Sequence, residues 1–202
     1  MKKPSPVSTV PKTDAEIIDG VRAGNTRAYA LLVDRHKDRA LTLAHRLVGD
    51  HMEAEELVQD AFVKAFRNLG QFRGDARFGT WFYRILYNLC MTQLRRRSGL
   101  PQMLDISDDA ALDALSADSE TPRVDESLET YDLVRFLSVE VEALPPQYRS
   151  AVTLFYVQDM TYEEIADIMN VPLGTVKTCL FRGRNLLKKR ISMRLKKEVN
   201  VA

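Results

Sequence analysis

The sequence predicts an all-α protein with two small helical domains, a four-helix unit and a helix-turn-helix unit, joined by an acidic flexible linker. Apolar residues recur at helical spacing in several stretches, no stretch shows strand alternation, and two basic blocks flank an acidic one. With 202 residues, 45% of them hydrophobic, the chain can bury one or two ordinary cores. We expect a disordered tail at 1–13, domains at 14–98 and 131–197, and the linker at 99–130.

Four helices are expected in the first domain. A short amphipathic stretch ends at Gly24, and Thr26 can cap a longer one that ends at Gly49. The fourth follows the glycine-rich loop GQFRGDARFG. The predicted helices cover residues 14–23, 26–49, 53–69 and 80–97.

The third of these helices has two unlike sides. One side is an apolar stripe of Val58, Ala61, Phe62, Ala65, Phe66 and Leu69. The opposite side carries Glu53, Glu56, Asp60, Val63 and Arg67, and its acidic residues have no obvious internal partner. This side is either simply solvated, as most charged surfaces are, or a docking surface for a basic helix of another protein.

The fourth helix mixes aromatic residues with arginines. This composition suits single-stranded nucleic acid, because unpaired bases stack on rings while arginines hold the backbone. Trp81 shares a stripe with Ile85 and Leu89, so a place in the core is the competing interpretation. Asn88, one turn after Arg84, has an amide that can read a base edge.

The second domain contains a helix-turn-helix pattern. Helices are expected at 131–144 and 147–157, and Thr161 with Glu164 forms a capping box for the next. The turn at 170–172 includes a proline, which cannot extend the preceding helix, and a basic helix begins near Leu173. Two short helices joined this way, the second basic, are typical of major-groove DNA binding.

The basic helix explains why Phe181 stands among cations. Its core stripe is formed by Val176, Leu180, Gly183, Leu187 and Ile191. On the other faces, Lys177 and Arg182 can donate to guanine, the Thr178 hydroxyl can serve several bases, and the Phe181 ring can touch a thymine methyl. The competing interpretation is a solvated basic face with Phe181 packed on a neighbouring helix.

The remaining features argue against several other classes. The net charge of +1 conceals all-basic stretches at 76–104 and 169–197 around an acidic middle, which suggests polyanion binding at two places. Cys90 and Cys179 have no companion at metal-ligand spacing, so we expect no zinc site or disulfide, and a reducing cytosol. The first residues lack a signal peptide's apolar segment and no run is long enough for a membrane span. No constellation of a catalytic or cofactor site is found.

Three stretches together resemble regions 2 and 4 of the extracytoplasmic-function sigma factors of the bacterial sigma-70 superfamily. The first is DAEIIDGVRAGNTRAYALLVDRH, followed by AEELVQDAFVKAFRNLGQFRGDARFGTWFYRILYNLCMTQLRRR. The third is LPPQYRSAVTLFYVQDMTYEEIADIMNVPLGTVKTCLFRGRNLLKKR. The resemblance covers nearly the whole chain apart from the tail and the linker.

The resemblance implies a non-catalytic, cytoplasmic initiation subunit of RNA polymerase that binds promoter DNA and needs no cofactor or metal. The implied partners are the clamp helices of the largest core subunit, the flap of the second largest, and an anti-sigma factor. For the minus-thirty-five element the implied residues are Arg149, Thr175, Lys177, Thr178, Phe181 and Arg182. For the minus-ten element they are Phe72, Arg73, Trp81, Arg84 and Asn88, and for the core polymerase Glu56, Leu57, Gln59 and Asp60.

Two points limit what the resemblance implies. Cys179 stands in the recognition helix where many relatives have a basic residue, so the promoter sequence does not carry over. The alternative function is a stand-alone helix-turn-helix regulator, which explains the second domain but leaves the first without a role.

Overall fold

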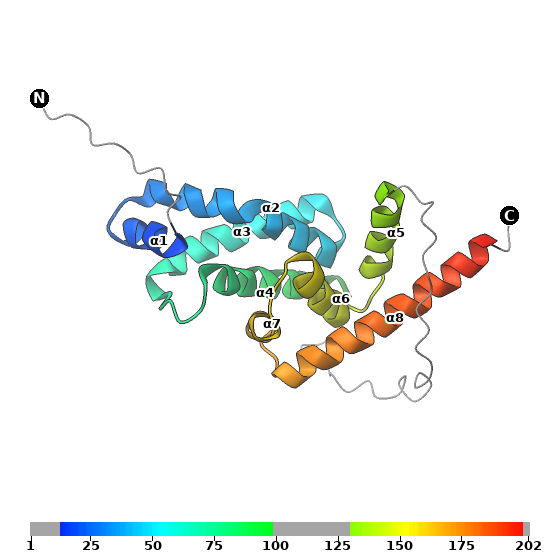
Figure 1. Cartoon of the computed structure of the whole chain (residues 1–202). Helices are drawn as coiled ribbons and strands as arrows, with labels where there is room; N and C mark the ends of the chain where they lie inside the picture. Colours follow the sequence, from blue (N-terminus) through cyan, green and yellow to red (C-terminus); the bar gives the residue numbers. More distant parts are fainter. Residues whose placement is uncertain (1–12, 99–129, 200–202) are drawn as a thin grey trace, which may run out of the picture.

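The computed structural model describes residues 13–98 and 130–199, and every regular element in these ranges is helical, which confirms the all-α prediction (Figure 1). The predicted linker, apart from Thr130, and the predicted tail, apart from Thr13, lie outside the described residues. The first unit comprises α1 (Asp14–Arg22), η1 (Thr26–Ala28), α2 (Tyr29–Val48), α3 (His51–Asn68), η2 (Leu69–Gln71) and α4 (Phe78–Ser98). The second unit comprises α5 (Thr130–Glu142), α6 (Pro146–Val152), the π-helical turn η4 (Thr153–Val157), α7 (Tyr162–Met169) and α8 (Leu173–Val199).

The first unit is a bundle in which α2, α3 and α4 pack on one another. Thr13 and Glu16 form a reciprocal capping box at the start of α1, and the Asp50 side chain accepts from the Glu53 amide at the start of α3. Gly49, with φ of 79°, closes α2 in the left-handed conformation that glycine adopts without strain. The expectation that Thr26 caps the long helix is wrong, because residues 26–28 form a 3₁₀ turn first and α2 starts at Tyr29 without a side-chain cap.

Stacked rings join α3 to α4 in the centre of the bundle. The Phe62 and Phe82 ring centroids lie 4.4 Å apart, and the Phe78 ring also stacks on Phe82, with centroids 6.0 Å apart. His36 packs on the Phe78 ring and its Nε2 lies 2.9 Å from Asp14 Oδ2, which ties α1 and α2 to this aromatic cluster. The start of α4 is thereby held in one position, and the loop before it is anchored at that end.

In the second unit α7 and α8 form the predicted helix-turn-helix. Thr161 and Glu164 make the expected capping box, with the Glu164 amide donating to Thr161 Oγ1 over 3.2 Å. Asn170 adopts the left-handed conformation, with φ of 55°, that turns the chain toward α8. The C-terminal part of α8 extends past the other helices (Figure 1).

The helices α6 and α8 cross at Gly183. A Cβ at this position would lie 2.9 Å from Val152 Cγ2 and 3.4 Å from Tyr148 Cβ, so a side chain has no room there. The crossing also sets the rotation of α8, because Val176 and Leu180 then face the interior. A small residue is required at this contact.

The two units share one continuous hydrophobic core. The buried cluster runs from Ile17 in α1 through α4 to Leu180 in α8. The helix α7 lies against α4, and α6 lies against α2. The described parts of the chain therefore form a closed arrangement in which the helix-turn-helix rests on the bundle.

The crossing at Gly183 predicts that Gly183→Ala lowers the free energy of unfolding by about 1–3 kcal/mol through overpacking. Urea denaturation followed by circular dichroism measures the change. Gly174→Ala is the matched control, since a Cβ there meets nothing within 4 Å, and alanine is expected to leave stability unchanged or raise it by up to about 1 kcal/mol. Equal effects of the two substitutions would contradict the proposed tight crossing.

A second prediction concerns Glu140, which is 3% exposed and joins α5 to α8 through Arg190 and Arg194, at 2.8 and 2.7 Å. The hydrogen bond from Arg194, foremost, holds the pKa of Glu140 below its ordinary value, and Arg190 acts in the same direction. A carboxylate whose pKa is lowered by folding stabilises the fold above its unfolded pKa, and this stability is lost as the pH falls through the folded pKa.

Glu140→Gln should therefore lower the free energy of unfolding by about 1.5–3 kcal/mol at neutral pH. The difference from the unmodified chain should shrink once the pH falls below about 4. Denaturation curves across this pH range measure both effects, with Glu142→Gln on the same helix as the control. A difference that does not depend on pH would show that the charge of Glu140 contributes nothing.

Candidate nucleic-acid and polymerase surfaces

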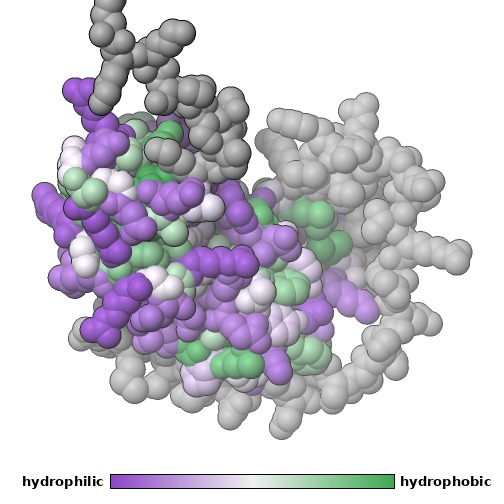
Figure 2. Space-filling model, turned by 60° about the vertical axis from the view of Figure 1, so that its left-hand side comes forward, coloured by the Kyte–Doolittle hydropathy of each residue, from purple (hydrophilic) through white to green (hydrophobic). Residues whose placement is uncertain are grey.

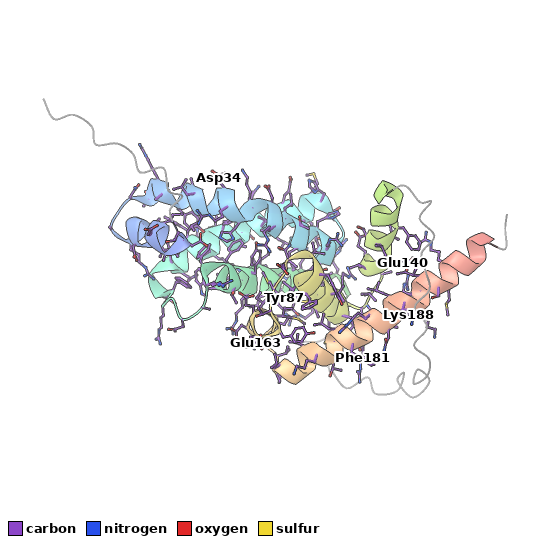
Figure 3. The ribbon with its side chains drawn as sticks, in the orientation of Figure 1. Asp34, Tyr87, Glu140, Glu163, Phe181 and Lys188 are labelled. Atoms are coloured by element: carbon purple, nitrogen blue, oxygen red, sulfur yellow. The ribbon has the colours of Figure 1, made fainter. Side chains whose placement is uncertain are left out.

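The outer face of α8 carries three of the predicted DNA-reading residues. Lys177, Thr178 and Phe181 are exposed, and 59% of Phe181 faces solvent (Figure 3). Behind them Val176 and Leu180 are fully buried, as their stripe predicts. The interpretation that Phe181 packs on a neighbouring helix is therefore wrong, and its ring is available to a ligand.

The rest of the predicted set on α8 lies partly inside. Thr175 and Arg182 are half-buried. Cys179 is 3% exposed and lies with Tyr87 of α4 around a pocket of about 220 Å³ between the two units. Burial raises the pKa of the Cys179 thiol. Cys179 therefore faces the bundle in this arrangement, which the recognition-helix position alone did not indicate.

Arg149 is half-buried, and its guanidinium contacts both units of the protein. Its guanidinium donates to the Leu144 carbonyl at 3.0 Å and, in the first unit, to the carbonyls of Leu47 at 2.9 Å and Arg46 at 3.4 Å. These two carbonyls belong to the last turn of α2, where intrahelical partners run out and a cation is favoured by the helix dipole. Burial lowers the pKa of Arg149. In this arrangement the Arg149 guanidinium contacts the last turn of α2, and its expected place near the promoter backbone stays a prediction.

The loop before α4 and the start of α4 hold an aromatic group. Trp81 is half-buried, with its ring centroid 5.1 Å from that of Phe72 and 5.9 Å from that of Phe78. Trp81 therefore packs partly in the core, as the competing interpretation expected, while part of its ring stays accessible. Phe72 also lines an open pocket of about 620 Å³ together with Asp14 and Arg35. Arg73, next to it, is exposed.

Arg84 and Asn88 lie on the outer side of α4, one helical turn apart. Both residues are exposed. Arg84 Nη2 donates to Asn170 Oδ1, in the turn before α8, over 3.1 Å. Asn88 lines the pocket between the units together with the same Asn170. The two side chains predicted to hold a promoter strand therefore meet the helix-turn-helix in this structure.

The acidic side of α3 divides into two parts. Glu56, Gln59 and Asp60 are exposed, as predicted for a docking surface. Leu57 belongs to the core with 9% exposure, so it lies behind this surface, and its expected contact with the polymerase stays a prediction. Glu53 has internal partners after all, because Arg97 lies 2.9 Å from its carboxylate.

Exposed apolar residues accompany these acids. Phe66, predicted in the apolar stripe of α3, is 41% exposed. Val63 of α3 and Leu31 of α2 are also exposed. The Phe66 ring packs edge-on against Tyr29, with centroids 5.0 Å apart. Figure 2 shows a largely hydrophilic face with smaller hydrophobic areas among the charged ones. An apolar area bordered by charge is typical of a protein-binding surface.

None of the helices described here is long and apolar enough to cross a membrane. Within residues 13–98 and 130–199 no cluster of three or more His, Cys, Asp or Glu side chains has the geometry to hold a metal ion.

The amino-acid sequence of the chain matches those of known proteins. The Sigma-70 region 2 family matches residues 32–99, and Sigma-70, region 4 matches residues 137–187. The RNA polymerase sigma-H factor of Pseudomonas aeruginosa is 35% identical over 180 residues, covering 87% of this chain and 92% of that protein. The ECF RNA polymerase sigma factor SigW of Bacillus subtilis is 32% identical, and the match covers 86% of this chain and 94% of that protein. The ECF RNA polymerase sigma-E factor of Escherichia coli is 33% identical, and the match covers 89% of this chain and 94% of that protein.

The chain therefore belongs to the sigma-70 family of RNA polymerase sigma factors, and within it to the extracytoplasmic-function (ECF) group. This confirms the family resemblance and the prediction of a sigma factor acting in transcription initiation. The relatives do not favour the stand-alone helix-turn-helix regulator.

Solved structures show the same fold. The sigma factor RpoE of Bartonella quintana, in complex with the anti-sigma factor NepR, matches with a TM-score of 0.59 and 23% identity, covering 81% of this chain and 96% of that one. CnrH, in complex with the cytosolic domain of CnrY, matches with a TM-score of 0.61 and 23% identity, covering 88% and 96%. The helical architecture is thus that of known sigma factors.

The outward orientation of Phe181 predicts a separation between stability and binding. Phe181→Ala should change the free energy of unfolding by no more than about 0.5 kcal/mol, because an exposed ring loses little packing. It should weaken duplex promoter binding by about 1–3 kcal/mol if the ring touches a base. Denaturation and fluorescence anisotropy measure the two effects.

The neighbouring Leu180→Ala is the opposite control, with an expected loss of about 2–5 kcal/mol in stability. A loss of that size for Phe181→Ala would mean that the ring packs inside the protein.

Proposed function

We propose that this chain directs RNA polymerase core to promoters by holding the minus-thirty-five element with the second unit and the minus-ten element with the first. The observation that carries the proposal is the presence of two distinct surfaces suited to nucleic acid on one chain, with sigma-70 regions 2 and 4 in order. A stand-alone regulator needs only one of these surfaces. The role is one of binding and needs no catalytic group or cofactor of its own.

At the minus-thirty-five element, α8 enters the major groove. Lys177 and Thr178 supply donors to base edges, and Phe181 supplies an apolar contact for a thymine methyl. Arg182 joins them once its half-buried guanidinium turns outward, and Thr175 lies at the edge of the contact. The sequence of α8 from Lys177 to Lys197 contains no carboxylate, so this stretch does not repel phosphate.

At the minus-ten element, the first unit holds one unpaired strand. The accessible edge of Trp81 and the pocket beside Phe72 offer stacking surfaces for bases. Arg73 and Arg84 supply charge for the backbone, and Asn88 an amide for a base edge. Strand opening is then favoured by binding energy, since an unstacked base gains new partners on the protein.

The exposed acids of α3 bind the core polymerase. Glu56, Gln59 and Asp60 offer acceptors to the basic clamp helices of the largest subunit, and Phe66 with Val63 supplies apolar contact. Partly apolar, partly charged surfaces of this kind combine affinity with correct orientation. The second unit contacts the flap of the second-largest subunit.

The setting of this activity is the bacterial cytoplasm, where the polymerase works. Two solved sigma factors of this fold were obtained with partners named as an anti-sigma factor and a cytosolic domain. We propose that an anti-sigma factor likewise controls this chain.

Reconstitution with core polymerase tests the proposal. The purified chain should form a stable complex with the core and give run-off transcripts from promoters selected out of genomic DNA. Asp60→Lys should weaken assembly by about 1–3 kcal/mol through charge reversal at the docking surface, without loss of folding because Asp60 is exposed. Asp19→Lys, a charge reversal on the distant α1, is the control. Tight duplex binding without any run-off would instead favour the stand-alone regulator.

A further inference from the structure

The loop 72–77, between η2 and α4, carries part of the surface proposed for the minus-ten strand. Its residues after Phe72 are all exposed, and the backbone hydrogen bonds of this described segment lie at its two ends. At the first end the Phe72 amide donates to the Leu69 carbonyl over 3.3 Å. At the other end the Trp81 amide donates to the Arg77 carbonyl over 3.2 Å. An exposed loop bonded in this way needs support from another element to keep one shape.

Arg22, the last residue of α1, supplies such support. Its Nη2 donates to the Leu69 carbonyl over 3.0 Å and also contacts the Phe72 carbonyl. Carbonyls at the end of a helix lack an intrahelical partner, and a charged donor bonds them more strongly than a neutral one. Asp19 lies 4.0 Å from Arg22 Nη1 and its side chain is 79% exposed, so this ion pair holds the guanidinium only weakly. The two carbonyls therefore fix the guanidinium, and the guanidinium fixes them.

The bond to Phe72 joins two sides of an open pocket of about 620 Å³. Asp14, Ala15 and Ile18 line this pocket from α1, Arg35 lines it from α2, and Phe72 with residues 74–78 lines it from the loop. In Figure 1 α1 lies beside the turn that leads from α3 to this loop. Arg22 follows Ile18 by one helical turn and does not itself line the pocket. It thus holds α1 and the loop together without filling the space between them.

The beginning of α1 is fastened as well. His36 Nε2 lies 2.9 Å from Asp14 Oδ2, and Arg35 also contacts Asp14. The His36 ring packs on Phe78, the first residue of α4, with centroids 5.3 Å apart. The helix α1 is therefore joined to the end of the loop through His36 and to its beginning through Arg22. A shift of the loop away from α1 would change the shape of the pocket.

Phe72 connects the backbone that Arg22 holds with the rings offered to a base. Its half-buried ring lies 5.1 Å from that of Trp81 and 6.1 Å from that of Phe78, measured between centroids. The rotamers open to a side chain depend on the backbone that bears it, so a fixed Phe72 carbonyl also limits where the ring can stand. Arg22 thereby acts on a stacking group 50 residues away in the sequence.

We propose that Arg22 is a positioning residue for promoter opening: by holding the Leu69 and Phe72 carbonyls it keeps the Phe72 ring and the following loop in the arrangement that accepts an unpaired base. This inference rests on the proposed minus-ten role of the first unit. Arg22 acts through the loop and makes no contact with DNA. Preorganised groups bind more tightly than groups that the ligand must first order, because that ordering costs free energy on binding.

Holoenzyme reconstituted from core polymerase and the full chain tests the proposal on a promoter fragment that gives run-off transcripts. The fragment carries 2-aminopurine in the non-template strand of the minus-ten element, and its fluorescence rises when the base leaves the stack. Arg22→Ala should lower the equilibrium constant for opening roughly 5- to 30-fold, the effect of losing the bonds of one charged donor. Arg22→Lys keeps the charge and a donor for one carbonyl, and it should recover part of the loss. Arg27→Ala, which removes a nearby exposed arginine of η1, should leave opening unchanged.

Two further measurements separate positioning from other roles. In Arg22→Ala, assembly with the core and binding to an upstream duplex with only the minus-thirty-five element should stay as in the unmodified chain. A joint fall of these two and of opening would show that Arg22 only stabilises the fold, and it overturns the inference. The plot of log opening constant against log salt should also keep its slope. A slope smaller by about 0.7 would reveal a direct phosphate contact of Arg22 and overturns the inference too.

The unmodified holoenzyme is measured before any variant. Its failure to open the fragment would refute the minus-ten role itself, and the inference with it. Opening by the unmodified chain together with equal opening by Arg22→Ala would overturn the inference alone.

Discussion

The helix α4 needs cover on two sides, and the arrangement of the other helices follows from this requirement. Phe82 and Cys90 face α3 and are fully buried. Tyr87 and Met91, on the other side, are buried beneath the second unit. A helix with apolar side chains on two faces is stable only when neighbours cover both faces. The second unit supplies this cover, at about 25 cal/mol for each Å² of apolar surface removed from water.

Arginines from both units hold the two units together. Arg84 and Arg149 donate to a side-chain amide and to helix-end carbonyls, which are neutral acceptors. A phosphate offers the same guanidinium a charged acceptor, and such bonds are shorter and stronger. The contacts of Arg84 and Arg149 within the protein thus lack a charged acceptor and are of the weaker, uncompensated kind.

Features encoded by neighbouring residues were predictable from the sequence, whereas contacts between distant residues were not. The capping box of Thr161 and the turn at 170–172 depend on a few adjacent positions, and the periodicity of α8 separated Leu180 from Phe181. Arg149 differs, because its acceptor at Leu47 lies 102 residues away and no local pattern marks it. Phe66 belongs to the apolar stripe of α3, yet it is exposed, because no other helix covers it completely. The spacing of apolar residues shows which face of a helix is buried, but it does not show which other element packs against that face.

The length of α8 links the two ends of the second unit mechanically. Its 27 residues span roughly 40 Å at 1.5 Å per residue. The exposed face at Lys177 lies toward one end, and Glu140 joins the other end to α5 through Arg190 and Arg194. The helix is therefore held at two places, the Gly183 crossing with α6 and the Glu140 contact with α5. The orientation of the exposed face is thus set by contacts that lie well away from it.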